Sequence, residues 1–204
     1  MMLLHSWQAN ANDEKYIQAM QKNIQAVYEA TSIDGLRIAV NGFERIGSVE
    51  TSRWEPQYYA AFGYLMMSTL EQDPEKKDVF IDLAMATVNK AKDIASDQSE
   101  VIALEGFALM MRVSVDPGSR GPLLAALSVQ SFEKALKLNP ENPRALVLLA
   151  RMQFGTAQFF GSSTTEACET LGRAMEKFEA FKSDNVLAPQ WGKPMALGLK
   201  EECK

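Results

Sequence analysis

Two cysteines and a single histidine are the residues of this 204-residue chain with the most distinctive chemistry. Cys168 and Cys203 lack the spacing of a metal site and have no histidine nearby. They are either two unrelated thiols or a disulfide that ties the C-terminal segment to the last helix pair, and a disulfide requires an oxidising compartment. In the chain-entropy model such a bond adds roughly 3 to 4 kcal/mol of stability. His5 lies near the N-terminus, which argues against a Ser–His or Cys–His nucleophile pair.

Other motifs that mark an enzyme are missing from the sequence. It contains no P-loop, no Gly-rich dinucleotide turn and no Cys/His set with zinc spacing. Acidic residues near Glu176 and Glu179 are ordinary for the surface of a helix. We therefore predict a protein that is not an enzyme, with no catalytic residue, no metal site and no cofactor.

The overall composition narrows the class of partner. Apolar residues make up 47% and charged residues 23% of the chain, which is typical of a globular protein. The net charge of -5 and the lack of a basic stripe argue against nucleic acid. No apolar run approaches the roughly 18 to 20 residues that span a bilayer, so we predict that the protein is not integral to a membrane.

The N-terminus has two interpretations. Residues 1–12 are either a flexible terminus or the remainder of an export signal, because Ala9, Asn10 and Ala11 form the small-residue pattern of a signal-peptidase site. Against export, the stretch lacks a basic region, and its apolar part, Met1 to Leu4, is short. We favour an exported, periplasmic protein of bacterial origin, with a cytoplasmic location as the alternative.

The rest of the chain is predicted to be helical throughout, because apolar residues recur at helical spacing and no alternating strand pattern occurs. Capping residues and prolines set the expected ends of the helices. The expected helices cover residues 13–31, 32–48, 55–71, 74–95, 99–113, 123–138, 143–160, 164–182 and 194–202. The segment VDPGSRGP, Val115 to Pro122, is predicted to be a long connection because it is rich in helix breakers.

A pattern of small and bulky residues recurs along these helices at one fixed spacing. It is formed by Ser128, Phe132, Ala135 and Pro140, and upstream by Ala39, Phe43, Ile46 and Thr51 and by Ala84, Val88, Ala91 and Ser96. Recurring helix pairs of this kind bury their apolar faces against neighbouring pairs. We therefore predict one domain of stacked helix pairs over residues 13–204, with an ordinary helical bundle as the competing fold.

The stretch SFEKALKLNPENPRALVLLA resembles a tetratricopeptide repeat (TPR) protein. Ser128, Phe132, Ala135 and Pro140 hold the places where the family has alanine, an aromatic residue, alanine and proline. Leu149-Ala150 fits the family's first helix, Gly106 fits in part, and Ala61 holds the matching small place of another helix. The resemblance covers residues 33–181, with repeats longer than the family's unit. It implies an all-α fold of antiparallel helix pairs, stacked as a right-handed superhelix with a C-terminal capping helix.

The resemblance also implies a concave groove, lined by the first helix of each pair, that binds an extended peptide or a helix. Aligning the repeats assigns to this groove Tyr58, Tyr59, Phe62, Met66, Leu104, Phe107, Met111, Arg151 and Phe154. The alternative is that these residues belong to the core or are covered by the protein's own termini. Only Arg151 matches the basic residues with which family members clamp a peptide carboxylate.

From this groove we predict an interaction module or scaffold that holds a protein or peptide partner. Two alternatives stay open. The first is a carrier of a small hydrophobic ligand, which the 11 methionines and the aromatic lining suggest. The second is a structural subunit that self-associates as a homo-oligomer.

Overall fold

The computed structural model describes the backbone of residues 3–203 and the side chains of residues 12–203, so the side chains of His5 and of Ala9 to Ala11 lie outside the described residues. Within the described part, the chain forms nine α-helices and no strand. The helices are α1 (Leu3–Glu29), α2 (Ile33–Val49), α3 (Glu55–Leu70), α4 (Pro74–Ile94), α5 (Ser99–Val115), α6 (Pro117–Leu138), α7 (Pro143–Phe160), α8 (Thr165–Ala180) and α9 (Lys193–Glu202).

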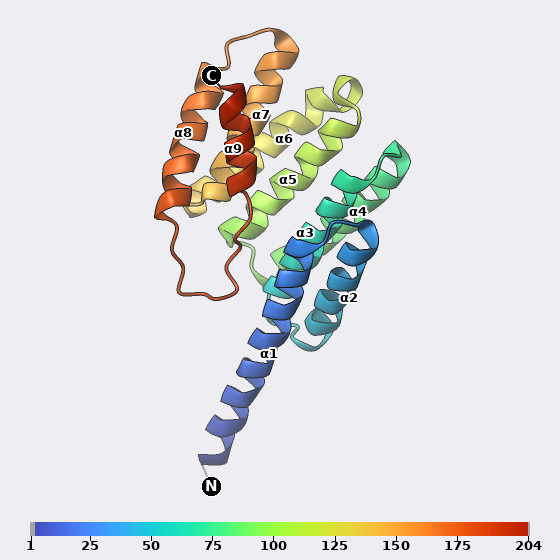
Figure 1. The fold of residues 1–204 in the computed structure, drawn as a ribbon, viewed down its shortest axis with the longest axis vertical. Coiled ribbons are helices and arrows are strands. Elements are labelled where there is room, and N and C mark those ends of the chain that lie inside the picture. The colour runs from blue at the N-terminus through green and yellow to red at the C-terminus, as the bar shows by residue number, and fades with distance from the viewer. Residues whose placement is uncertain (1–2, 204) are drawn as a thin grey trace.

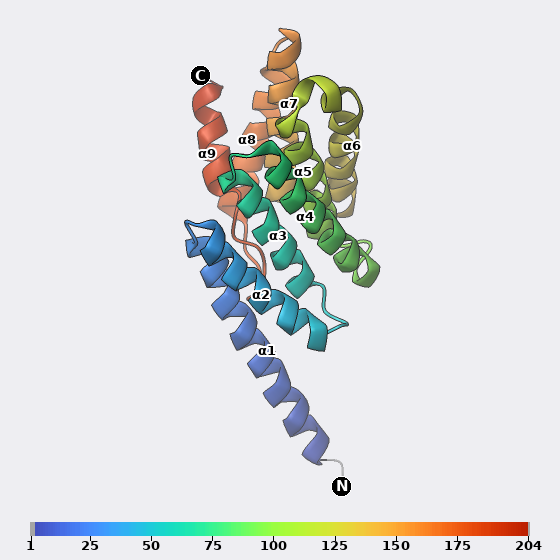
Figure 2. The same ribbon diagram turned by 90° about the vertical axis from the view of Figure 1, so that its right-hand side faces the viewer.

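Consecutive helices pack as the antiparallel pairs α1–α2, α3–α4, α5–α6 and α7–α8 (Figure 1). The first helices of neighbouring pairs also contact one another, α1 with α3, α3 with α5, and α5 with α7. Figure 2 shows the stack from the side, with α9 beside the last pair. The prediction of an all-α, TPR-like superhelix that ends in a capping helix is confirmed.

Polar side chains fix where several of the helices begin. Ser32 Oγ accepts a hydrogen bond from the amide of Gly35 at 3.1 Å. Asn142 Oδ1 accepts from the amides of Arg144 and Ala145 at 2.9 and 3.1 Å. The first amides of a helix have no partner within the helix, so such caps favour a helix start at these positions.

The recurring small and aromatic residues lie where neighbouring helices approach each other closely. Phe132 of α6 is fully buried, and Ser128 Oγ donates a hydrogen bond to the Gly106 carbonyl of α5 at 2.8 Å. A Cβ on Gly106 would lie only 2.5 Å from the Phe132 ring. The repeated pattern is therefore explained by close helix packing, in which a larger residue would force the helices apart.

The prediction of a long connection over Val115–Pro122 is wrong. Only Asp116 separates α5 from α6, and α6 begins at Pro117 and continues through the second proline of the segment. The Asp116 side chain caps the new helix, and a proline in the first turn needs no amide partner. Arg120 also forms a two-bond ion pair with Asp78 of α4, at 2.6 and 2.7 Å. A tertiary contact thus holds a helical turn that the composition disfavours.

The first helix begins earlier than predicted. α1 starts at Leu3 rather than near Asp13, and no glycine or proline interrupts it. Figure 1 shows its N-terminal half extending beyond the other helices, while Met20 and Val27 are buried in the core. Among the described residues, no helix is both long enough and apolar enough to cross a membrane.

The chain between α8 and α9, residues 181–192, is irregular, and we term it the C-terminal strap (Figure 1). Gly192, with a φ of 104°, makes the turn from the strap into α9. A disulfide joins Cys168 of α8 to Cys203 at the end of α9, with the two Cα atoms 5.8 Å apart. α9 is thus held covalently against α8.

Candidate functional site

The C-terminal strap covers the inner face formed by the first helices of the repeats. The Tyr59 hydroxyl of α3 donates a hydrogen bond to the Leu187 carbonyl of the strap at 2.7 Å. The Gln190 amide of the strap donates to the Tyr28 hydroxyl of α1 at 3.1 Å. The face that the sequence predicts as a groove is therefore in contact with the protein's own C-terminal segment.

Trp191 of the strap contacts this face through two stacked rings and one hydrogen bond. Its indole ring stacks on Phe62, with centroids 5.1 Å apart, and on Phe107, with centroids 5.8 Å apart. Its Nε1 donates a hydrogen bond to the Tyr58 hydroxyl at 2.9 Å. The ring is only 8% exposed, so Trp191 anchors the strap on α3 and α5.

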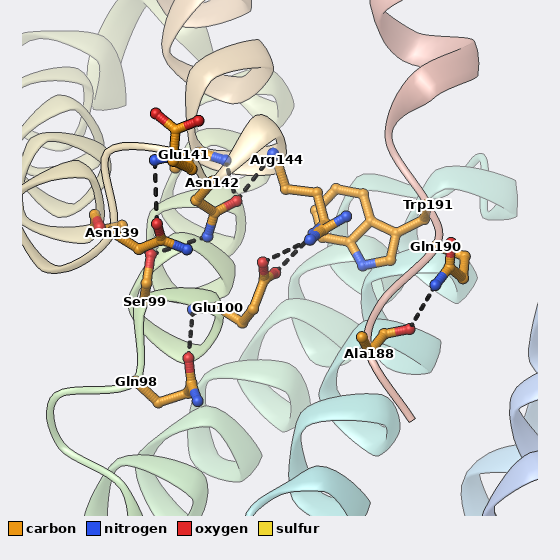
Figure 3. A network of polar contacts seen from close by, with 12 residues as sticks. Gln98, Ser99, Glu100, Asn139, Glu141, Asn142, Arg144, Ala188, Gln190 and Trp191 are labelled. Atoms are coloured by element: carbon orange, nitrogen blue, oxygen red, sulfur yellow. Dashed lines mark hydrogen bonds and ion pairs between the residues drawn. The ribbon is translucent and has the colours of Figure 1, made fainter. Parts of the chain in front are cut away.

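A buried ion pair lies beside Trp191 (Figure 3). Arg144 of α7 binds Glu100 of α5 through two hydrogen bonds of 2.8 Å, and the Tyr58 hydroxyl donates to the same carboxylate at 3.3 Å. Burial alone would lower the pKa of the Arg144 guanidinium, but the Glu100 carboxylate raises it above its usual value. Burial, followed by Glu100, raises the pKa of Tyr58 well above its usual value. Arg144 therefore stays charged and Tyr58 neutral, so Tyr58 keeps the proton that it donates to Glu100 while its oxygen accepts from the indole.

Arg144 also fixes the path of the strap. Its guanidinium lies over the Phe181 ring, 4.6 Å from the centroid, at the point where the strap leaves α8. At the other end of the strap, a Cβ on Gly192 would lie 3.2 Å from Arg144 Cγ. The buried Arg144 side chain is thus close to both ends of the strap.

Beside the strap lies a cavity of about 530 Å³. Its walls come from α1, α2, α3, α5, the strap and the start of α9. They are formed by Val27, Tyr28, Ala30, Leu36, Phe62, Met66, Thr69, Leu70, Phe107, Gln190, Trp191, Gly192, Pro194 and Met195. Among these lining residues none is charged and none is a histidine. The cavity can hold a flat apolar group against aromatic rings, and it offers no strong acid or base.

The polar groups of this cavity are few. Tyr28 packs edge-on against Phe62, at 5.9 Å between centroids, and is about one-third exposed. Burial raises the pKa of its phenol, so the group stays protonated near neutral pH. Besides Tyr28, only Thr69 and Gln190 bring polar side chains to the walls.

The nine residues that the sequence assigns to a groove are distributed over several environments. Phe62, Met66 and Phe107 line the cavity. Tyr58, Tyr59 and Leu104 are fully buried beneath the strap or in the core. The other three residues do not line the cavity, and they comprise Met111, which is half-buried, Phe154, which is buried, and Arg151, which is exposed.

Sequence reasoning left open that the protein's own termini cover the predicted groove, but it named no residue of α1 or of the C-terminal strap as part of it. Tyr28, Trp191 and Met195 form much of the wall, and all three lie outside the first helices that the repeat pattern assigns to the groove. Trp191 is the residue that could have indicated the strap. A large aromatic side chain near Pro189, in a segment without helical periodicity, is expected to pack against another part of the chain.

A second hollow, of about 450 Å³, is lined by residues of α4, α5 and α6. Its polar lining consists chiefly of Asp78 and Asp82, which already pair with Arg120 and Arg112. Within the described residues, no group of three or more His, Cys, Asp or Glu residues could hold a metal ion. The cavity beside the strap is therefore the candidate site.

No protein-family model matches the chain, and no curated protein does so. The structure is similar to that of the HusA haemophore from Porphyromonas gingivalis, with a TM-score of 0.82 and 28% sequence identity over 93% of this chain and 92% of that chain. Two further matches are the MamA RS-1 ArsTM double mutant and a second MamA structure. The first has a TM-score of 0.47 and 15% identity over 81% of this chain and 78% of that chain. The second has a TM-score of 0.33 and 13% identity over 85% of this chain and 99% of that chain. These two values are too low to carry an argument. The similarity to a haemophore supports a binding role for this chain.

Proposed function

We propose that this protein is a carrier of a flat, largely apolar small molecule, and that a porphyrin such as haem is its cargo. The observation that carries the proposal is the aromatic, uncharged cavity between α1, α3, α5 and the strap. The similarity of the whole chain to a haemophore supports the choice of a porphyrin.

The size and lining of the cavity are suited to such a cargo. Its volume of about 530 Å³ falls within the range of small-molecule sites, roughly 300 to 1,000 Å³. Phe62 and Trp191 contribute aromatic carbon to the lining, and Met66 and Met195 offer flexible thioethers that adapt to the edge of a ligand. A flat macrocycle would be bound chiefly by burial of its apolar faces.

The cavity offers weak ligands for iron. Histidine is missing from the lining, and the raised pKa of Tyr28 disfavours the phenolate that would bind ferric iron. Only the thioethers of Met66 and Met195 and the neutral phenol are available. We therefore expect the ring rather than the metal to dominate recognition, so that iron-free protoporphyrin binds with an affinity within about tenfold of haem.

The proposal is tested by titrating the disulfide-bonded protein with haemin and with iron-free protoporphyrin IX, following porphyrin absorbance and tryptophan fluorescence. The informative variant is Met66→Glu, which places a charge in the apolar cavity. Its matched control is Met111→Glu, because Met111 is also a half-buried methionine but does not line the cavity. Circular dichroism checks that both variants stay helical.

We expect Met66→Glu to weaken porphyrin binding at least tenfold, since burying an unpaired carboxylate is unfavourable, while Met111→Glu binds as the unchanged protein does. Failure of the unchanged protein to bind either porphyrin at micromolar concentration would refute the proposal. If the two variants weakened porphyrin binding equally, the porphyrin would bind outside this cavity.

A peptide or protein partner is the second candidate, and the strap itself favours it. The strap lies on the inner face as an irregular segment with a turn at residues 186–187, and it is held there through main-chain groups, the Leu187 carbonyl and the Gln190 amide. The face can therefore hold a peptide, but a partner would have to displace the strap. A labelled synthetic peptide of residues 182–192 tests this, because it would bind the intact chain only if the strap can exchange.

The disulfide supports an exported location for this carrier. Disulfides persist in oxidising compartments and are rare in the cytosol. A non-reducing mass measurement on protein isolated from its source would show whether Cys168 and Cys203 are joined there.

A further inference from the structure

We propose that the Cys168–Cys203 disulfide controls the cavity, so that its reduction by a dithiol loosens α9 and the strap and releases the cargo. This inference rests on the proposed carrier function. It concerns the regulation of the same cavity, one wall of which is restrained while the two sulfurs are bonded.

One wall of the cavity belongs to the segment that the disulfide restrains. Gln190, Trp191, Gly192, Pro194 and Met195 all line the cavity, and they run from the end of the strap into the first turn of α9. Displacement of α9 therefore displaces this wall. The opposite walls, on α1, α3 and α5, belong to the body of the repeat array.

Besides its packing on α7 and α8, α9 is tied at each of its ends. At its far end Cys203 is bonded to Cys168, and at its near end Lys193 forms a 2.8 Å ion pair with Glu179. That ion pair is largely exposed, with side-chain exposures of 45% and 67%, and such pairs contribute little. Of the ten residues of α9, only Ala196 and Leu199 are buried. The disulfide is thus the covalent restraint on this short helix.

Reduction of the disulfide would leave the noncovalent contacts of the strap intact. The Tyr59 hydroxyl donates to the Leu187 carbonyl, and the Gln190 amide donates to the Tyr28 hydroxyl. These bonds and the stacked Trp191 favour the closed position in either redox state. We therefore expect reduction to raise the population of open strap, while the helix pairs stay folded.

The redox step is an ordinary thiol–disulfide exchange. A dithiol attacks one of the two sulfurs, the S–S bond breaks, and a mixed disulfide forms; the second thiol of the reductant then completes the exchange. Cys168 and Cys203 gain two electrons and two protons and become thiols, and the dithiol becomes a disulfide. Both cysteines are only partly buried, so a reductant can reach them.

The first test needs no ligand. Hydrogen–deuterium exchange of residues 185–192 is compared in the oxidised protein and after treatment with dithiothreitol, with a thiol titration to confirm that two thiols have formed. We expect exchange in this segment to rise at least tenfold on reduction, and exchange in α3 and α5 to change little. The matched control is the double variant Cys168→Ser, Cys203→Ser, which should exchange as the reduced protein does and should not respond to dithiothreitol.

The second test measures affinity for iron-free protoporphyrin IX, a probe whose lack of iron avoids reactions of the metal with the thiol. We expect the reduced protein and the serine variant to bind at least tenfold more weakly than the oxidised protein. Unchanged affinity after complete reduction would overturn the inference, and so would unchanged exchange of the strap. If the oxidised protein binds no porphyrin, the carrier function fails instead, and the exchange experiment alone decides whether the disulfide holds this wall.

Discussion

Replacement of Trp191 by alanine is the sharpest test of how the strap is held. The indole is 92% buried, stacks on two phenylalanines and donates one hydrogen bond. Burying an aromatic side chain of this size removes about 200 Å² from water, which at about 25 cal/mol per Å² amounts to about 5 kcal/mol as an upper estimate. Measured replacements of buried tryptophan by alanine cost about 3 to 5 kcal/mol. We expect Trp191→Ala to lower the free energy of unfolding by about 4 kcal/mol.

The assay is thermal unfolding of the oxidised protein, followed by circular dichroism. For a chain of this length, 1 kcal/mol corresponds to about 2 to 4 °C in Tm, so Trp191→Ala is expected to lower Tm by about 8 to 16 °C. The matched control is Trp191→Phe, which keeps an aromatic ring but loses the N–H that donates to Tyr58. A single hydrogen bond of this kind contributes about 1 kcal/mol, so the control should lose only about 2 to 4 °C.

A loss of less than about 3 °C in Trp191→Ala would refute this reasoning. It would mean that the indole is not buried on Phe62 and Phe107 in solution. Equal losses in the two variants would assign the stabilisation to the hydrogen bond rather than to the stacked ring.

Three further predictions concern stability. Gly192→Ala is expected to lower the free energy of unfolding in urea by about 2 to 4 kcal/mol, and Gly161→Ala by about 1 kcal/mol. Both glycines have a positive φ, but only a Cβ at Gly192 would collide with a neighbouring ring, that of Phe178, at 2.8 Å. Above pH 10, the free energy of unfolding should fall by about 1.4 kcal/mol per pH unit for each of Tyr58 and Tyr59. Burial is the main reason that their pKa values are raised in the folded state, so above pH 10 only the unfolded chain loses these protons. Replacement of either tyrosine by phenylalanine should reduce the slope of unfolding free energy against pH. Arg144→Leu is expected to cost about 3 to 5 kcal/mol, since it leaves a buried carboxylate unpaired, and a thermal shift below about 2 °C would contradict this.

Most of the helix positions could be predicted because the signals that set them are local. Ser32 and Asn142 cap helices that begin where their sequence pattern indicates. Phe132 and Ala135 mark the pairing of α5 with α6, because their spacing reflects a close packing that a short stretch of sequence encodes. The first turn of α6 was mispredicted because its breaker-rich composition hid the local cap at Asp116, and because the ion pair of Arg120 with Asp78, 42 residues away, also supports it.

The candidate site could be predicted only in part, for a related reason. Phe62 and Phe107 lie on helices whose inner faces follow from the repeat pattern. Trp191 lies in a segment without periodicity, and its partner Tyr58 is 133 residues away in the sequence. Nothing local to residues 181–192 specifies where the strap folds back, so the cavity wall that it forms emerges only from the tertiary structure.

The strap also adds contacts between repeats that are far apart in the sequence. An ordinary solenoid has contacts only between adjacent repeats, so its repeats can fray from the ends one after another. Here the strap joins partners 128, 133 and 162 residues apart, through Tyr59, Tyr58 and Tyr28. These bonds connect the end of the chain to the first two repeats and raise the contact order of the fold. The chain should therefore unfold as one cooperative unit and refold slowly for an all-helical protein, since its last segment must find its first helices.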